Sequence, residues 1–261
     1  MKLCFSTLGC TERSLDEVLS LAKGFPCDAL ELRGLCNETD VRKMTELLPE
    51  NRRKTKNSFR EYGVSPLILG TSCTFHDASK LDKNLEEGFY AIDAAHDVGF
   101  YGIRVFGNSI KGDEGDCLRR IADGISALCR YASDKNVAVL LETHGDINTE
   151  ERLGAVAEIC GKYESFGILW DVCHTRRTYG EHWRDFCNTF GGLIRHVHLK
   201  DVAGDTLVLP GKGDLPLRAM AEHLTAKGYE GYFSLEWEKK WHPELPAIED
   251  ALSALAEVFK E

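Results

Sequence analysis

Several features that would place the protein in a specialised class are missing from its sequence. The ten cysteines are scattered and no two are spaced as Cys-x-x-Cys, which favours buried reduced thiols over a disulfide framework. No apolar run is long enough to span a membrane, and residues 1–5 lack the apolar core of a signal peptide. We therefore expect a cytoplasmic protein that does not associate with membranes.

The sequence also lacks an excess of positive charge. Its 32 Lys and Arg are outnumbered by 42 Asp and Glu, which gives a formal net charge of -10. Such a balance favours solubility and disfavours tight binding to nucleic-acid phosphates. No Gly-x-Gly-x-x-Gly follows the first predicted strand, which argues against a nucleotide-binding Rossmann fold.

Short apolar segments alternate instead with amphipathic helical patterns along all 261 residues. The segments that predict strands are residues 3–5, 28–32, 64–69, 101–106, 137–141, 168–171, 195–199 and 233–236. They recur after about thirty residues, the length of a βα unit. No linker or change in composition divides the chain, so we predict one domain over residues 1–261, an α/β fold of the (β/α)8 TIM-barrel type. A doubly wound open sheet is the alternative, and it usually needs fewer strands.

Helix signals lie between these strands. Ser14 and Glu17 have the spacing of a capping box, and Gly99 closes a later helical pattern. The basic stretch 51–56 is interpreted as a solvated helix face. The helix after the second strand is predicted from the apolar residues Val41, Met44, Leu47 and Leu48.

Four consecutive predicted strands end at an ionisable side chain. These residues are Glu142, Asp171, His198 and Glu236. In a barrel the carboxyl ends of all strands open on one face, so these groups are expected side by side. Three neighbouring carboxylates would repel one another, and a divalent cation resolves that conflict. Mixed oxygen and nitrogen ligands suit Mn, Co, Mg or Zn, and the ligand types do not choose among them.

A simpler interpretation exists for each of these residues. A single Glu or Asp at a strand end is more often a helix cap or an ion-pair partner. Four such residues on consecutive strands favour the metal site. A carbohydrate or keto-acid site without a metal is the remaining alternative.

Five segments resemble the xylose isomerase-like TIM-barrel superfamily, which contains sugar and sugar phosphate isomerases and epimerases together with family 2 AP endonucleases. The matching segments are Leu141-Glu142-Thr143-His144, Trp170-Asp171-Val172-Cys173-His174, His196-Val197-His198-Leu199-Lys200-Asp201, Gly211-Lys212-Gly213 and Ser234-Leu235-Glu236. The strand spacing fits as well, so the resemblance covers nearly the whole chain.

The resemblance implies that Glu142, Asp171, His198 and Glu236 hold one divalent metal. It also implies that Glu142 and Glu236 act as base and acid on opposite faces of the substrate, and that His174 contacts it. The metal would polarise a carbonyl, one Glu would remove the neighbouring proton, and a metal-stabilised enediolate would follow. Reprotonation on the other face gives epimerisation, reprotonation on the neighbouring carbon gives isomerisation, and loss of a β-hydroxyl gives dehydration.

Further candidates surround this predicted site. Glu31 ends the second strand and is predicted to contact substrate. Arg104, inside the fourth strand, is expected to hold a barrel carboxylate or a substrate carboxylate. Lys200 is interpreted either as a substrate contact or as a solvated loop lysine. His196 is expected to face away from His198 and to be packed or hydrogen-bonded.

The segment after the seventh strand carries two more features. Residues 211–213 lie where barrels often bind phosphate, but a simple turn before a helix at Pro216 is the preferred interpretation. Asp201 is a candidate for a supporting contact to the metal ligands. Glu238 shares a face with Glu236, and Glu236 is the better match to the family.

The leading function is therefore a metal-dependent isomerase or epimerase acting on a small carbohydrate or hydroxyketone, with no nucleic-acid or membrane partner. A dehydratase acting on a keto-inositol or a dehydroshikimate-like compound is the second. An AP endonuclease would bind three zinc ions and need more histidines, where this chain has Gly107-Asn108 and Asp214-Leu215-Pro216. A barrel that serves only as a scaffold predicts missing ligands, and none is missing. Formation of a homo-oligomer is left open.

Overall fold

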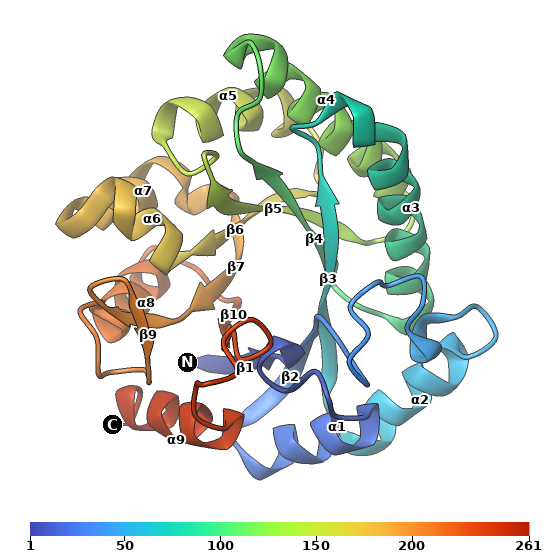
Figure 1. The fold of residues 1–261 in the computed structure, drawn as a ribbon, viewed down its shortest axis with the longest axis vertical. Coiled ribbons are helices and arrows are strands. Elements are labelled where there is room, and N and C mark those ends of the chain that lie inside the picture. The colour runs from blue at the N-terminus through green and yellow to red at the C-terminus, as the bar shows by residue number, and fades with distance from the viewer. Residues whose placement is uncertain (261) are drawn as a thin grey trace.

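The structure is a closed parallel barrel inside a ring of helices (Figure 1). It is a computed structural model that describes residues 1–260. The barrel strands are β1 (Lys2–Ser6), β2 (Cys27–Leu32), β3 (Ser65–Thr74), β4 (Gly102–Asn108), β5 (Ala138–Gly145), β6 (Phe166–Asp171), β7 (Ile194–Leu199) and β10 (Tyr232–Leu235). The first strand pairs with both β2 and β10, so the ring is closed and the open-sheet alternative is excluded. The predicted TIM barrel is confirmed, and every predicted strand overlaps an observed one; Glu261 lies outside the described residues.

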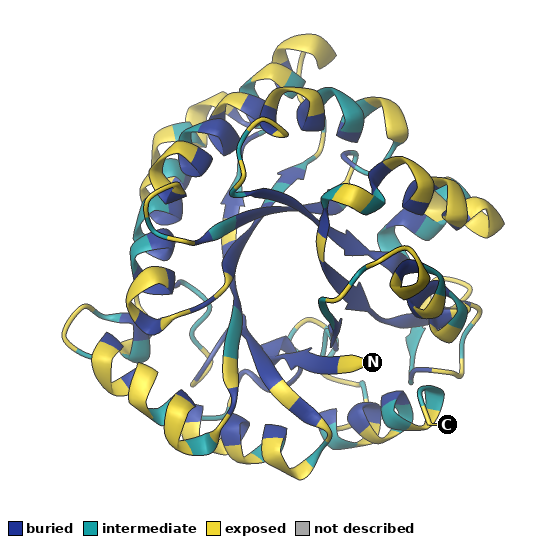
Figure 2. Ribbon diagram, turned by 180° about the vertical axis from the view of Figure 1, so that it is seen from behind, coloured by how far each residue is buried: buried dark blue, intermediate teal, exposed yellow. Residues whose placement is uncertain are grey.

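The helices cover the outside of the barrel with their apolar faces turned inward (Figure 2). They are α1 (Leu15–Gly24), α2 (Arg52–Tyr62), α3 (Leu81–Val98), α4 (Glu114–Ala132), α5 (Glu150–Cys160), α6 (Val172–Tyr179), α7 (Trp183–Phe190), α8 (Leu217–Ala226) and α9 (Ile248–Val258). The predicted capping box of Ser14 and Glu17 begins α1. Gly99 ends α3 with a left-handed backbone at φ 102°, as its position predicted.

The helix predicted from Val41, Met44 and Leu47 is wrong. These residues are buried, but they lie in an irregular segment with one short 3-10 turn, Thr45–Leu47. Their spacing reflects a loop packed under the helix ring and is not a helical period. The helix of this unit is α2, which begins within the basic stretch 51–56, and most of its basic side chains are exposed as expected.

The position of the site follows from the alternation of side chains along the strands. Ile68, Leu140 and Leu169 come from three different strands and form a small apolar cluster of their own inside the barrel. Residues two apart in a strand share a face, so Gly70, Glu142 and Asp171 lie on the same inner face, one step nearer the carboxyl ends. The interior of the barrel is therefore filled by apolar side chains in its middle and by polar side chains nearer the carboxyl ends of the strands.

One feature of the barrel face was not predicted. After β7 the chain forms a short antiparallel pair, β8 (Asp201–Ala203) and β9 (Thr206–Val208), before α8 begins.

Among residues 1–260, no helix is both long and apolar enough to cross a membrane. The ten cysteines are free, as the sequence predicted.

Candidate metal centre at the carboxyl ends of the strands

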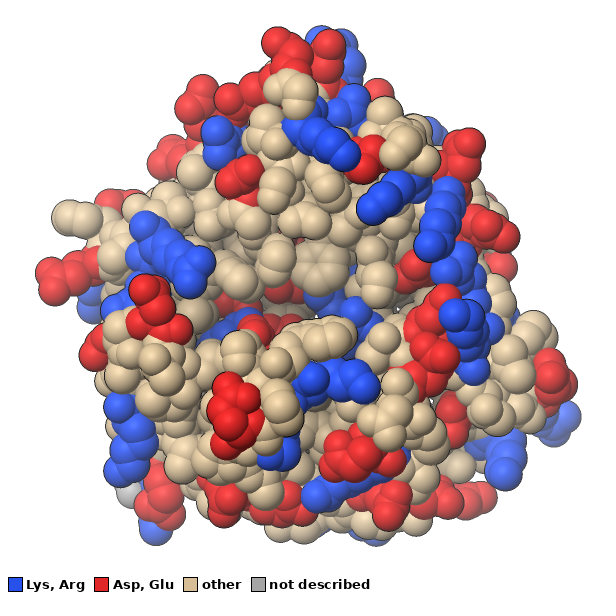
Figure 3. Space-filling view, in the orientation of Figure 1, with Lys and Arg blue, Asp and Glu red and all other residues tan. Residues whose placement is uncertain are grey.

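The four predicted ligands meet at the carboxyl ends of adjacent strands. One ligand atom from each of Glu142, Asp171, His198 and Glu236 lies within 4.8 Å of the others, and all four residues are buried. The strand register brings them together, because Asp171 on β6 and Ser234 on β10 both pair with His198 on β7. Figure 3 shows acidic and basic side chains together in the hollow at the centre of this face.

Asp171 uses only one of its two oxygens for folding. It is the N-cap of α6, and its Oδ1 accepts hydrogen bonds from the backbone N–H groups of Cys173 (2.9 Å) and His174 (2.8 Å). This bond pattern fixes the carboxylate and leaves the buried Oδ2 to an ion pair with Lys200 Nζ at 3.0 Å. His174, which the resemblance assigns to substrate contact, lies in the first turn of α6.

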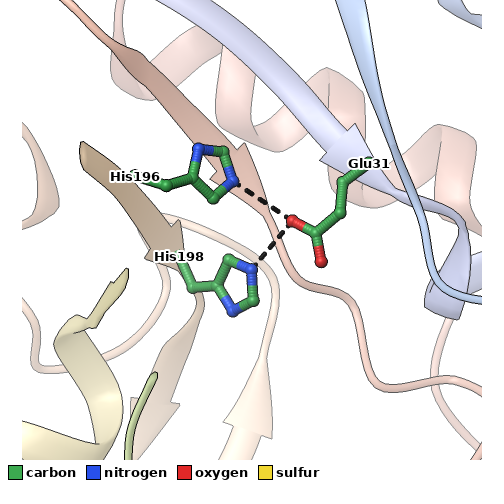
Figure 4. Close-up of side chains that lie close together, drawn as sticks. All are labelled: Glu31, His196 and His198. Atoms are coloured by element: carbon green, nitrogen blue, oxygen red, sulfur yellow. Dashed lines mark hydrogen bonds and ion pairs between the residues drawn. The ribbon is translucent and has the colours of Figure 1, made fainter. Parts of the chain in front are cut away.

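His198 is oriented through one ring nitrogen and leaves the other free. Its Nε2 lies 2.8 Å from Glu31 Oε2 (Figure 4). Its Nδ1 has no hydrogen-bond partner, and lies 3.3 Å from Glu236 Oε1 and 3.9 Å from Asp171 Oδ2. Metal-binding histidines are commonly held by a carboxylate on the second nitrogen in this way. Asp171 Oδ2 and His198 Nδ1, which face each other across the site, therefore fit a divalent cation with mixed oxygen and nitrogen ligands.

The prediction that His196 faces away from His198 is wrong. Both side chains point into the barrel, since residues two apart in a strand share a face. His196 Nε2 lies 3.2 Å from Glu31 Oε2, and Ser234 Oγ donates to the same oxygen at 3.2 Å. His196 is hydrogen-bonded, as predicted, but inside the barrel below His198.

Glu31 was predicted to contact substrate, which assumes an open environment, but its environment in the structure is closed. It is fully buried, and one of its oxygens accepts from His196, His198 and Ser234. The charges of the two histidines outweigh the effect of burial and hold the pKa of Glu31 well below its usual range. These contacts give Glu31 the geometry of a group that positions His198.

Lys200 is buried within the cluster and is not the solvated loop lysine of the alternative interpretation. It is 1% exposed, and its Nζ lies 3.0 Å from Asp171 Oδ2 and 2.5 Å from Glu236 Oε2. It also pairs with Glu238, which shares the face of Glu236. Burial opposes the charged form of Lys200, but the surrounding carboxylates raise its pKa well above the usual value.

The two predicted acid–base residues have contrasting surroundings. Glu142 accepts a hydrogen bond from Arg104 Nη1 at 2.9 Å, yet burial raises its pKa. Burial acts in the same direction on Glu236, but the charges of His198 and Lys200 outweigh it and bring its pKa well below the usual value. Two carboxylates whose environments separate their protonation are a common arrangement at sites of proton transfer.

The Gly211–Gly213 segment forms a turn, which was the preferred interpretation of the sequence, and its backbone N–H groups already donate hydrogen bonds within the chain. The carboxylate of Asp201 accepts from the N–H groups of Gly211 (2.9 Å), Gly213 (3.0 Å) and Leu215 (3.2 Å). Asp201 therefore closes this loop and does not support the metal ligands. The same N–H groups are not available to a phosphate.

A second hollow lies at the opposite end of the barrel. This cavity of about 650 Å³ is bordered by the amino ends of β7 and β10, including Ile194, Arg195 and Tyr232. None of the predicted ligands lines it. The converging ionisable side chains at the other end make that end the better candidate for catalysis, as in TIM barrels generally.

The fold and this cluster together define a TIM barrel whose side chains at the carboxyl ends of the strands are arranged as a candidate divalent-metal site. The family model described as xylose isomerase-like TIM barrel matches residues 19–258. The chain therefore belongs to the xylose isomerase-like TIM-barrel family, as its motifs predicted.

Individual relatives include enzymes of two reaction classes. Fructoselysine 3-epimerase of Escherichia coli O157:H7 is 29% identical over 167 residues, which cover 61% of this chain and 56% of that enzyme. Inosose dehydratase of Geobacillus thermodenitrificans is 27% identical over 140 residues, covering 46% of each chain. The chain thus matches about half the length of these curated relatives. The solved structure of the IOLI protein with a zinc atom superposes with a TM-score of 0.80 at 20% identity, over 99% of this chain and 98% of that one.

Proposed function

We propose that the protein is a divalent-metal-dependent epimerase or isomerase of a small sugar, sugar phosphate or related hydroxyketone. The observation that carries the proposal is the convergence of three buried carboxylates and one imidazole at the catalytic end of the barrel. The match to an epimerase acting on a sugar derivative supports the reaction class. We also propose a cytoplasmic location, which the free cysteines support.

Glu142, Asp171, His198 and Glu236 would hold one ion of Mn, Co, Mg or Zn. When bound, the ion supplies a positive charge that polarises a substrate carbonyl and acidifies the proton on the next carbon. Asp171 and His198 serve only as ligands, because each is fixed through its second polar atom by the N-terminus of α6 or by Glu31.

Glu142 and Glu236 would move the proton. They lie on β5 and directly after β10, with β6 and β7 between them, so they approach the substrate from different directions. One removes the proton from the carbon beside the carbonyl and the other returns a proton to the opposite face. Arg104 and Lys200 hold these two carboxylates in place. We keep His174, which is partly exposed, and the buried Lys200 as predicted substrate contacts.

The second candidate is a dehydratase, which the match to inosose dehydratase favours. The first proton removal would be the same, and a β-hydroxyl would then leave as water with a proton from the second carboxyl group. The two candidates differ in product, since a dehydratase forms an unsaturated ketone that absorbs ultraviolet light.

The test is to incubate the metal-loaded protein with ketoses, keto-inositols and their phosphates in deuterated water. We expect solvent deuterium at the carbon beside the carbonyl of at least one compound. Glu142→Gln and Glu236→Gln should each slow this exchange by about 10²–10⁴-fold. Glu249→Gln is the control, because Glu249 pairs with Arg13 at α9 and should leave exchange unchanged. Normal exchange in both active-site variants would overturn the proton-transfer roles.

A further inference from the structure

An arginine that sequence reasoning missed lies beside the candidate metal centre. Arg33 follows β2 two residues after Glu31, so its side chain enters the barrel on the same face. It is only 7% exposed, and donates to the Thr39 carbonyl (3.0 Å) and to Ser72 Oγ (3.1 Å). Among residues 1–260, no carboxylate forms an ion pair with it. Arg33 is therefore a buried cation whose side-chain hydrogen bonds go only to neutral groups.

Arg33 lies next to Arg104. A Cβ atom on Gly70 would lie 2.6 Å from Arg33 Cδ and 3.0 Å from Arg104 Nη2, so only glycine leaves room for both. Arg104 donates a hydrogen bond from Nη1 to Glu142, while its buried Nε has no hydrogen-bond partner. Burial and the charge of Arg104 lower the pKa of Arg33 to about 10, which still leaves it charged near neutral pH. Two guanidinium groups thus share one side of the site.

Glu142 compensates the charge of Arg104, but Arg33 has no ion-pair partner of its own, and a buried charge needs a compensating charge or hydrogen bonds. The planar fork of arginine matches the oxygens of a carboxylate or a phosphate. The loop where barrels often bind phosphate offers no alternative, since Asp201 already occupies its N–H groups. An anion from outside the chain would complete the Arg33 and Arg104 pair.

We propose that Arg33 and Arg104 form an anion subsite, and that the substrate is a hydroxyketone carrying a carboxylate or a phosphate group. This proposal rests on the proposed function, because it assigns the charge of the substrate in the same site. Arg104 connects the two halves: it contacts Glu142 on the metal side, and it lies with Arg33 beside Gly70 on the other. The anion would dock against the guanidinium pair while the carbonyl end lies toward Glu142 and Glu236.

Binding of small probes tests the subsite directly. Metal-loaded protein is titrated by calorimetry with glycerol 1-phosphate, with glycerate and with uncharged glycerol. We expect one or both anions to bind at least tenfold more tightly than glycerol, and Arg33→Met to remove that preference. Preference for the phosphate or for the carboxylate identifies the group. Equal binding of all three probes, or an unchanged preference in Arg33→Met, would overturn the subsite.

Arg52 provides a matched control. It has the same exposure of 7%, but pairs with Asp97 at 2.9 Å, far along the chain from the site residues. Arg52→Met should leave anion binding unchanged and lower the melting temperature of the protein. Arg33→Met should raise the melting temperature of the anion-free protein, because it removes an unpaired buried charge. A fall in melting temperature of the same size in both variants would make Arg33 a structural residue.

Deuterium exchange separates this proposal from the proposed function. If uncharged ketoses exchange as fast as anionic ones, and Arg33→Met alters neither, the subsite is refuted and the proposed function stands. If Arg33-dependent anion binding is found but no compound exchanges, the subsite stands and the proposed function fails.

Discussion

Glu31 offers the sharpest test of how the barrel prepares its candidate metal site. Its Oε2 accepts from Nε2 of His198 at 2.8 Å, and this bond leaves Nδ1 as the nitrogen that faces Asp171 and Glu236. Glu31→Gln keeps the size of the side chain but replaces the charged acceptor by a neutral amide. His198 then loses the partner that fixes its tautomer and ring orientation.

The expected loss follows from the contacts. Removing a carboxylate that orients a ligating histidine typically weakens metal binding by about 10–100-fold. Such a loss corresponds to about 1.4–2.7 kcal/mol of binding free energy. Glu31→Ala would leave His196, His198 and Ser234 without their acceptor, at about 1–3 kcal/mol for each buried unpaired group. We therefore expect Glu31→Gln to impair metal binding and Glu31→Ala to lower the free energy of unfolding as well.

The assay is competition between the protein and a chelating dye for Mn²⁺ or Zn²⁺, with nitrogen NMR of His198 as an independent readout. Ser234→Ala is the matched control, because it removes one neutral donor to the same oxygen of Glu31 and keeps both histidine contacts. Its metal affinity should stay within about threefold of the wild type. Unchanged affinity in Glu31→Gln, with the wild-type tautomer of His198, would refute the positioning role.

Three further outcomes are expected. Asp171→Asn should lower metal affinity at least 100-fold but keep the cap of α6. Asp171→Ala should lower the free energy of unfolding by about 1 kcal/mol more than Asp171→Asn, as measured by denaturant titration. Equal metal binding by the wild type and Asp171→Asn would contradict the role of Asp171 as a ligand. Lys200→Met should destabilise the metal-free protein by about 3–5 kcal/mol, because the buried carboxylates of Asp171 and Glu236 lose their counter-charge. The Lys200 ammonium and a bound metal would contact the same two carboxylates, so added Mn²⁺ should raise the melting temperature more in the variant than in the wild type. Identical shifts would show that ammonium and metal do not compete for these carboxylates. Burial opposes the charged form of His198, but Glu236 and Glu31 raise its pKa well above the usual value. The charged imidazole therefore stabilises the metal-free fold at low pH, and this contribution is lost as the pH rises through the raised pKa. Metal binding must displace that proton, so affinity should fall about tenfold per pH unit below the raised pKa, with about one proton released, as calorimetry in buffers of different ionisation enthalpy would show; no proton release would contradict the assignment of Nδ1.

The ends of the strands were the most predictable part of the molecule. Buried parallel strands are short apolar runs, so a charged residue that ends one must lie at the rim. For this reason the sequence alone indicated that Glu142, Asp171, His198 and Glu236 meet. The family motifs then reinforced the same four positions, and the register of β6, β7 and β10 brings them together as expected.

Side chains inside the barrel were harder to predict. His196 and His198 share the inner face because they are two residues apart, and this parity was misjudged. The same parity places Arg33 above Glu31, so an explicit count of inner-face residues from Glu31 would have found it. The partner of Asp201 could not be predicted, because its hydrogen bonds depend on how the loop after β7 folds back. The buried segment 41–48 showed that apolar spacing alone does not distinguish a helix from a packed loop.

Four buried side chains from adjacent strands converge, and we propose that together they hold one divalent cation. The most direct measurement is the number of Mn²⁺ or Zn²⁺ ions bound per chain at equilibrium dialysis, compared between the wild type and Asp171→Asn. We expect one ion per wild-type chain and a large loss of affinity in the variant. A wild-type protein that binds no ion at saturating metal, or a variant that binds as tightly as the wild type, would contradict it.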